Sequence, residues 1–406
     1  MPAQLARQLL LTCTLFVPLP ASAGFITLGD LAGGTFSSRA TAITPDGNYV
    51  IGYSSVSSRG DHAFRWAATT GMVDLGEIPG FGSLGQNIKA RAVSADGSII
   101  VGESSAGTIP GTQAFRWTES DGMVGLGDLV ETTAGPFSRM RSFAYTISGD
   151  GSLIAGDSRH PVSGSTTPMQ YTRADGMTGI ELSVSNPANG ANTVYGSTFD
   201  GSVLVGSINS VTSGKLNEAF RWTATGGIER LGFVDTGNIS QAHAVTPDGA
   251  VIVGTARDPL QLHAFRWTDA DGFDLLNDGT VFQASGALAV SASGTTIVGT
   301  AHTFVSGGPN AMIWDNQNGM QLLSDVLAMQ GDDLMGYTLI DATGISADGR
   351  TITGTAIRPG GGFEAYVAVL THQSTSVPEP CGTVIWLAAM AHLGFVRRRP
   401  SATHRR

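Results

Sequence analysis

One phrase recurs seven times along the chain: a small-apolar run, an Asp-Gly pair in six of the seven copies, and an apolar run that ends in Gly. Clear copies are "ARAVSADGSIIVGES" (90–104) and "AHAVTPDGAVIVGTA" (242–256). The turn glycines of the seven copies, spaced 45 to 55 residues apart, are Gly47, Gly97, Gly151, Gly201, Gly249, Gly294 and Gly349. Self-similarity at a period of about 50 residues is typical of stacked or ring-shaped repeat folds.

Each unit predicts about four short strands. Asp-Gly between two apolar runs is a hairpin signal, because Gly accepts the positive φ of the turn. A second phrase follows 18 to 21 residues later and is "HAFRW" at both 62–66 and 263–267; its alternation places Phe64 and Trp66 on one strand face. A third phrase, "GMVGLG" (122–127), supplies the fourth strand. Together with 55 glycines and only 14% charged residues, this pattern predicts an all-β protein.

The seam between the first and last units predicts a closed ring. The seventh unit ends with "EAYVAVL" (364–370) and has no third phrase after it, whereas "GFITLGDL" (24–31) closely matches "GMVGLGDL" (122–129). We expect the N-terminal strand to complete the last blade, which would remove the open sheet edges. The prediction is a seven-bladed β-propeller over residues 24–370. Six or eight blades and a β-solenoid are the alternatives.

Residues 1–23 have the pattern of an export signal. Arg7 precedes an apolar stretch, and Ala21 and Ala23 are small residues suited to cleavage before Gly24. Lipidation at Cys13 is the alternative, which the bulky Thr12 disfavours. Cleavage before Gly24 would leave Cys381 as the only thiol, so we expect stability to come from packing and not from a disulfide.

The C-terminal region has three parts. After a linker (371–376), "VPEP" (377–380) precedes sixteen largely apolar residues (381–396) and a run of three arginines. As a helix the apolar stretch would rise about 24 Å, and snorkelling arginines can make up the difference from a hydrocarbon core of about 30 Å. The prediction is a single transmembrane helix with its arginines on the cytoplasmic side. A buried helix of a soluble protein is the alternative.

This tail (377–400) resembles the PEP-CTERM sorting signal. The residues that match are the motif Val377, Pro378, Glu379 and Pro380 and the basic stop Arg397, Arg398 and Arg399. The resemblance implies a Gram-negative host that makes exopolysaccharide, and an exosortase-type enzyme that recognises the motif and removes the helix. Cys381 and His392 depart from the usual composition of that helix, but not from the motif.

The repeats themselves resemble those of the HAF-repeat family of bacterial extracellular proteins, through "HAFRW", "VSADGS" and "LGDL". The likeness extends over the whole repeat region. It implies a repeat architecture and an extracellular location, with no established activity or catalytic residues.

Composition and motifs exclude several classes of function. Residues 24–380 keep all 33 acidic residues but only about 17 of the 23 basic ones, because six arginines lie outside, so the net charge of this part is about −16. A basic stripe for nucleic acid is therefore not expected. The sequence has no G-x-S-x-G elbow, zinc helix or phosphate loop, so we assign no catalytic residue, metal ligand or cofactor.

The repeated polar and aromatic residues are interpreted as structural. The position of His62 and His263 holds Gln113, Thr167, Glu218, Asn310 and Glu364 in other units, which predicts a solvated strand start. Five of the six tryptophans recur at the end of the same phrase and predict packing between blades, in preference to a platform for sugars. We expect the arginines between them to pair with acidic turns or backbone carbonyls.

Three weaker features concern ligands. Asp269, Asp271 and Asp274 offer oxygen atoms that suit calcium, but the full calcium-loop pattern is missing. The longest irregular segments, 77–89, 129–142 and 325–336, are expected on one face of the ring, where they would build a binding surface. Asp332 and Asp333 lie in the last of them, and no role is assigned to them.

The sequence thus predicts an exported, non-enzymatic protein of the cell surface or extracellular matrix. We expect it to be held transiently in the inner membrane, processed at its tail and associated with exopolysaccharide. The alternative is an extracytoplasmic propeller enzyme, a polysaccharide lyase or hydrolase, which would need converging carboxylates or a His/Tyr set on inner strands.

Overall fold

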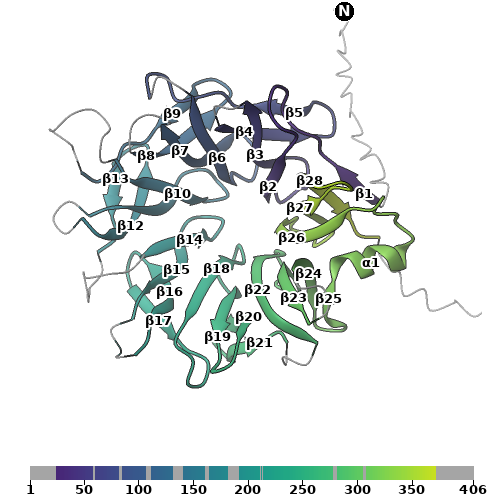
Figure 1. Cartoon of the computed structure of the whole chain (residues 1–406). Helices are drawn as coiled ribbons and strands as arrows, with labels where there is room; N and C mark the ends of the chain where they lie inside the picture. Colours follow the sequence, from purple (N-terminus) through teal and green to yellow (C-terminus); the bar gives the residue numbers. More distant parts are fainter. Residues whose placement is uncertain are drawn as a thin grey trace, which may run out of the picture. The chain divides into compact units, whose positions relative to one another are not determined.

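The computed structural model describes residues 24–371, apart from 58–59, 82–84, 107–110, 131–139, 161–163, 182–191, 211, 213, 278–280 and 305–307. The described residues form seven four-stranded antiparallel sheets arranged as the blades of a ring (Figure 1). The predicted seven-bladed all-β propeller is confirmed, and the alternatives of six or eight blades or a solenoid are excluded.

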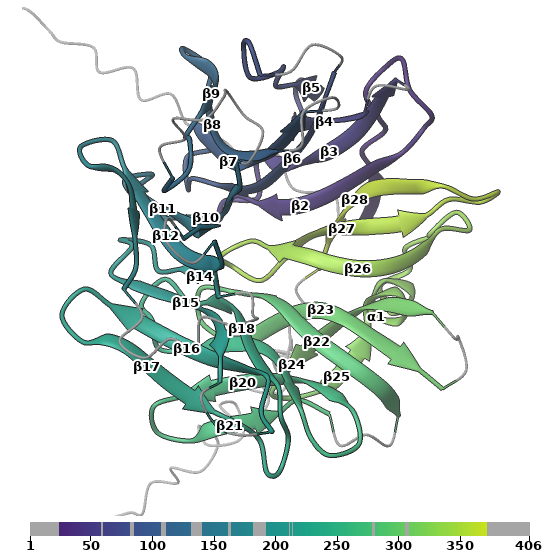
Figure 2. The same ribbon diagram turned by 60° about the vertical axis from the view of Figure 1, so that its left-hand side comes forward.

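Each blade runs from an inner strand to an outer one (Figures 1 and 2). The inner strands are β2 (Ser38–Ile43), β6 (Gln86–Val93), β10 (Ser142–Ile147), β14 (Thr193–Ser197), β18 (Ser240–Val245), β22 (Phe282–Val290) and β26 (Thr338–Ile345). The second strands are β3 (Val50–Ser57), β7 (Ile99–Ala106), β11 (Ile154–Arg159), β15 (Val203–Asn209), β19 (Ile252–Arg257), β23 (Thr296–Thr303) and β27 (Thr351–Ile357).

The third strands carry the "HAFRW" phrase, and the fourth strands form the rim. The third strands are β4 (Gly60–Ala67), β8 (Thr112–Thr118), β12 (Thr166–Thr172), β16 (Asn217–Thr223), β20 (Leu262–Thr268), β24 (Pro309–Asp315) and β28 (Phe363–Val369). The outer strands are β5 (Gly71–Asp74), β9 (Gly122–Gly125), β13 (Gly176–Gly179), β17 (Gly227–Gly232), β21 (Gly272–Leu275), β25 (Gly319–Leu322) and, in the last blade, β1 (Gly24–Thr27).

The ring closes as the seam predicts. β1 pairs antiparallel with β28, from Gly24 opposite Val369 to Thr27 opposite Tyr366. Phe25 on this strand lies 5.6 Å and 5.7 Å, between ring centroids, from Tyr337 and Tyr366. The N-terminal strand is therefore the outer strand of a blade whose other three strands come from the other end of the chain.

The repeated Ser/Thr-x-Asp-Gly phrase builds the turn between the first two strands. In the second blade Asp96 Oδ1 accepts hydrogen bonds from the Ser94 hydroxyl (2.6 Å) and the Ser98 amide (3.0 Å), while Ser94 Oγ accepts the Ile99 amide (2.9 Å). Gly97 takes φ 72°, a conformation that only Gly adopts without strain. Sequence and turn geometry therefore agree at this repeated site.

A second repeated glycine is needed for close approach. A Cβ on Gly102 would lie 2.0 Å from the Lys89 carbonyl oxygen and 2.9 Å from the Phe115 ring. The backbone of the second strand thus packs closely against the inner strand and under an aromatic ring of the third strand, which explains why the apolar run ends in Gly in all seven copies.

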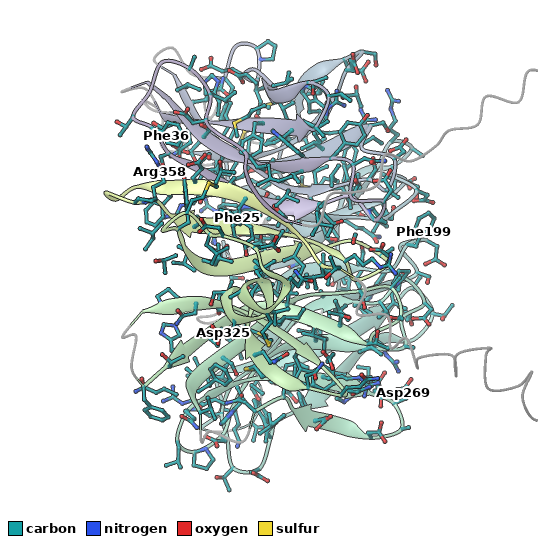
Figure 3. The ribbon with its side chains drawn as sticks, turned by 90° about the vertical axis from the view of Figure 1, so that its right-hand side faces the viewer. Phe25, Phe36, Phe199, Asp269, Asp325 and Arg358 are labelled. Atoms are coloured by element: carbon teal, nitrogen blue, oxygen red, sulfur yellow. The ribbon has the colours of Figure 1, made fainter. Side chains whose placement is uncertain are left out.

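The propeller has two unlike faces. The turn face carries the Asp-Gly turns and the short turns between third and fourth strands; the loop face carries the loops between second and third strands and the connections from one blade to the next. In Figure 3, Phe199 and Asp269 lie on the turn face, and Phe36 and Arg358 lie on the opposite, loop face. The described parts of the three irregular segments predicted to share one face all belong to the loop face.

One of these segments is not a simple loop. Residues 323–330 form helix α1 (Leu323–Gln330), which ends at Gly331 and buries Leu323 and Leu327 against the last two blades. Among the described residues α1 is the only α-helix, and no helix there is long and apolar enough to cross a membrane. The expected transmembrane helix (381–396) lies outside the described residues.

Candidate functional site

The polar start of the "HAFRW" strand is buried, so the prediction of a solvated position is wrong. His263 is 2% exposed, and its Nδ1 and Nε2 lie 3.2 Å from Asn277 Oδ1 and 3.0 Å from Asp258 Oδ2. Four equivalent residues are also buried, namely Gln113, Thr167, Glu218 and Glu364. Several of these polar residues have a partner of their own nearby, as Glu218 does in Arg230 at 2.8 Å.

His62, like Asn310, is a half-buried member of this set. Its Nδ1 lies 2.9 Å from Asp74 Oδ2, and its Nε2 lies 3.3 Å from Glu77 Oε1. The hydrogen bond to Asp74 raises the pKa of His62, against the opposing effect of burial. The two histidines therefore tie their strands to neighbouring connections and carry no common site.

The repeated tryptophans pack between blades, as predicted. Trp117, for example, is 8% exposed and belongs to one core cluster with Ile51 and Ala63 of the preceding blade. The guanidinium of Arg65 lies 5.1 Å from the Trp117 ring and 3.5 Å from Glu119 in the turn that follows it. The "HAFRW" phrase is thus an inter-blade joint.

The same joint accounts for the acidic turn residues. Arg221 reaches from the fourth blade to the Trp267 ring (5.4 Å) and to Asp269 (2.9 Å) in the fifth. Asp271 accepts a 2.9 Å hydrogen bond from the Thr268 hydroxyl. No group of three His, Cys, Asp or Glu side chains is placed to hold a metal ion among the described residues.

The inner strands contain a feature that the sequence did not predict. Each has a β-bulge at the same point of the repeat, where one residue has no partner on the second strand. The bulged residues are Thr41, Arg91, Tyr145, Tyr195, His243, Leu288 and Thr343, and all seven are half-buried. Bulges turn a side chain out of the regular alternation and recur next to functional sites.

Three of the bulged residues join neighbouring blades. The hydroxyls of Thr41 and Thr343 donate to the carbonyl oxygens of Ala90 (2.9 Å) and Ala40 (3.0 Å) on the next inner strand. His243 Nδ1 makes the equivalent contact with the Ala287 carbonyl at 2.8 Å. Because a carbonyl only accepts, Nδ1 carries the proton and Nε2 keeps its lone pair.

Arg91, Tyr145 and Tyr195 do not make this hydrogen bond. Together with His243 they form a continuous set on four adjacent blades, which we call the inner arc. Arg91 Cζ lies 5.9 Å from the Tyr145 ring, Tyr145 lies 5.7 Å from Tyr195, and Tyr195 meets His243 edge-on at 5.8 Å. A second ring, Phe143, stacks on Tyr145 at 5.8 Å.

Two buried acids lie behind the inner arc. Glu103 holds Arg91 through two oxygens, at 2.8 Å from Arg91 Nε and 2.5 Å from Nη2. Asp157 is 3% exposed; one oxygen accepts from Thr193 at 3.1 Å, and the other has no partner among the described residues. Burial raises the pKa of Asp157 to about 6, and burial also lowers the pKa of His243, which is therefore neutral at pH 7.

Two open hollows lie away from the inner arc, on either side of Arg257 on the loop face. Their volumes are about 380 Å³ and 480 Å³, and His302 and Asp258 are the titratable residues that join Arg257 in lining them. Neither brings together a base and an acid in hydrogen-bond contact.

Several predicted residues fall outside the described part. These are the cleavage residues Ala21 and Ala23, the sorting motif 377–380 and the basic stop 397–399. In the irregular segment, Asp333 accepts the Met335 amide at 2.8 Å and so shapes its own turn.

The inner arc could have been found from one signal in the sequence. In "ARAV" (90–93), "AYTI" (144–147) and "AHAV" (242–245) the flanking small residues repeat, whereas the second residue changes freely and is large. A position that varies between copies and holds large side chains, between small residues that repeat, indicates a role other than packing.

Comparison with known proteins supports the fold. No family model matches the chain, and no curated protein matches its sequence. An oligogalacturonate lyase from Vibrio parahaemolyticus superposes with a TM-score of 0.54 at 12% identity, covering 87% of this chain and 99% of that one. The propeller domain of the Trilobed protease from Pyrococcus furiosus gives 0.51 at 10% identity, with coverages of 82% and 94%, and a TolB from Acinetobacter baumannii gives 0.45 at 12%, with 85% and 80%. The superpositions with TM-scores above 0.5 support the propeller fold.

Proposed function

We propose that this chain is an exported, non-enzymatic protein of the cell surface or extracellular matrix of a Gram-negative bacterium. It is a HAF-repeat protein that an exosortase-type enzyme processes at its PEP-CTERM signal, and its propeller binds exopolysaccharide. The observation that carries the proposal is the position of the expected processing sites relative to the closed ring.

Both sites flank the ring without interrupting it. The expected signal cleavage releases Gly24, which is the first paired residue of β1. At the other end β28 finishes at Val369, and the compact propeller unit extends to Leu370, before the linker and the motif 377–380. Removing both ends therefore leaves all seven blades intact.

The experiment is to produce the full chain in a Gram-negative strain that encodes an exosortase, and to measure the mass and location of the product. We expect a mature protein that begins at Gly24, ends near the motif and lies outside the inner membrane. Glu379→Ala should leave the tail attached and the protein in the inner membrane. Glu181→Ala, an exposed acid of the propeller, is the matched control. A mature mass that Glu379→Ala changes by the substitution alone would refute the sorting proposal.

A second candidate is a polysaccharide lyase, and the inner arc is the observation that favours it. The enzymatic alternative requires a His/Tyr set on inner strands, and Tyr145, Tyr195 and His243 form one. Neutral His243 with a free Nε2 is suited to accept a proton. The acids behind the arc are buried, which does not suit the two accessible carboxyls of a hydrolase. Shortening of a polysaccharide by the purified protein would favour the lyase; retention without shortening supports the binding protein.

A further inference from the structure

We infer that the inner arc is the ligand site of the propeller, and that it binds an uncharged polysaccharide chain through Tyr145, Tyr195 and His243. This inference rests on the proposed function in one respect: it gives the surface polymer a binding site and a chemical class.

The two tyrosines of the inner arc lack the hydrogen bond that other bulged residues make to the next blade. At the bulge, Thr41, Thr343 and His243 each join the next blade by a hydrogen bond to a backbone carbonyl. Tyr145 and Tyr195 occupy the same position but donate to no described residue. A repeat that gives up a structural hydrogen bond in adjacent blades, and places a large ring there, is serving a role other than packing.

The polar atoms of the arc are available. Among the described residues, the buried side-chain atoms without a hydrogen-bond partner are Asp157 Oδ1, Ser207 Oγ and Arg266 Nε. The two tyrosine hydroxyls and His243 Nε2 also have no hydrogen-bond partner in this part of the chain, and they are not among these fully buried atoms; the three residues are half-buried. They supply two donors and one acceptor beside three half-buried rings that lie 5.7 Å and 5.8 Å apart.

The ring of bulged residues is one-sided. Opposite the arc it holds Leu288, Thr343 and Thr41, which are smaller, and the two threonine hydroxyls are already engaged. An elongated ligand therefore has its aromatic and polar contacts on the side of the second to fifth blades. Tyrosine offers an apolar face and a polar tip at once, which matches a sugar ring with its C–H face and its hydroxyls.

The charges around the inner arc do not favour an anionic ligand. Arg91 is neutralised by its two-oxygen contact with Glu103, so it offers no net positive charge to a ligand. Asp157 adds negative charge behind the rings above its pKa of about 6. With about −16 charges on residues 24–380, a polyanion would meet repulsion on approach. The arc is therefore suited to a neutral glycan.

The experiment titrates the full chain, labelled with 13C in its tyrosine rings, with neutral hexasaccharides of β-1,4-glucan, β-1,3-glucan, β-1,4-mannan and β-1,4-xylan. Hexagalacturonate is the anionic probe. We expect saturable shifts of the Tyr145 and Tyr195 ring signals, assigned with Tyr→Phe variants, on addition of at least one neutral hexasaccharide.

The variants separate stacking from hydrogen bonding. Tyr195→Ala should weaken binding about tenfold or more, since buried tyrosine contacts dominate such interfaces. Tyr145→Phe and Tyr195→Phe keep the ring and should weaken binding about fivefold, the usual effect of one neutral hydrogen bond. Tyr49→Phe, on the turn face beside Arg65, is the matched control and should bind as the wild type does. The Tyr→Phe variants keep the test valid if Tyr195→Ala does not fold.

The inference is overturned by any of three results. These are no saturable shift of either tyrosine up to about 10 mM of every probe, binding to hexagalacturonate alone, and binding that the tyrosine substitutions leave unchanged. The measurement needs no processing step, so Glu379→Ala protein should bind equally well. Wild-type protein that binds but is not processed would contradict only the proposed function, and wild-type protein that is processed but does not bind would contradict only the inner-arc site.

Discussion

The buried carboxyl of Asp157 makes a quantitative prediction about stability. Burial raises its pKa from 3.8 to about 6, and the side chain is 3% exposed, so solvent screens it little. Between these two pH values the folded protein binds more protons at this group than the unfolded chain does. The free energy of unfolding should therefore fall as pH rises through this window. About 2 pKa units at about 1.4 kcal/mol each correspond to roughly 3 kcal/mol lost by neutral pH.

Asp157→Asn removes the charge and keeps an oxygen to accept from the Thr193 hydroxyl. We expect the variant to be more stable than the wild type by about 1–3 kcal/mol at pH 7.5 and equally stable near pH 4. Urea unfolding followed by tryptophan fluorescence at four pH values between 4 and 7.5 measures this difference.

Asp150→Asn in the same blade is the control with the opposite sign. Hydrogen bonds from Ser148 and Ser152 lower the pKa of Asp150, so its contribution is present above the unfolded pKa and is lost as pH falls. This exposed variant should be slightly less stable at pH 7.5. An Asp157→Asn protein that is less stable than the wild type at pH 7.5, or whose difference does not vary with pH, would refute the reasoning.

Two further predictions test the frame, by urea unfolding and limited proteolysis. Gly102→Ala should lower the free energy of unfolding by about 3 kcal/mol or more, because its Cβ would lie 2.0 Å from a backbone oxygen. The control Gly122→Ala, with φ 67° and open space around it, should lower the free energy of unfolding by about 1 kcal/mol. Equal effects of the two substitutions would contradict the explanation of Gly102 by close approach of two strands. Phe25→Ala should lower the free energy of unfolding by about 2 kcal/mol and make the pairing of β1 with β28 accessible to protease, because the contacts with two tyrosine rings are lost. Ile26 is 42% exposed, so the control Ile26→Ala should change the free energy of unfolding by less than about 0.5 kcal/mol. If β1 stays resistant to protease in the Phe25→Ala variant, the backbone hydrogen bonds between β1 and β28 are sufficient to keep the ring closed.

The architecture was predictable because its signals are local and repeated. A turn such as Ser94–Ile99 needs an acceptor, a carboxylate and a Gly within six residues, and seven copies make chance resemblance negligible. The pairing of β1 with β28 joins residues more than 330 positions apart, yet the likeness of 24–31 to 122–129 contains the information. A long-range contact could be predicted here because the missing strand has visible copies elsewhere.

Burial at the polar position of the third strand could not be predicted in the same way. His263 depends on Asp258 and Asn277, and Glu218 depends on Arg230, which lie in segments that differ from blade to blade. Tolerance of different polar residues was interpreted as exposure to water. In the structure, His263 and Glu218 are buried and each has polar partners of its own, and no pattern within the phrase contains that information.

The bulged position of the inner strands shows how a variable position in a ligand site differs from a variable position with a structural role. Both positions vary in sequence and both are polar in most blades, but the third-strand residues find partners within the fold. At the bulge, Thr41 and His243 do so, whereas Tyr145 and Tyr195 leave their hydroxyls free and the neighbouring carbonyls without this contact. Variation alone is therefore weak evidence for function in a repeat protein. A repeated hydrogen bond that several adjacent units omit, while they place larger side chains at the same point, is stronger evidence, because packing gives no reason for both changes to occur together.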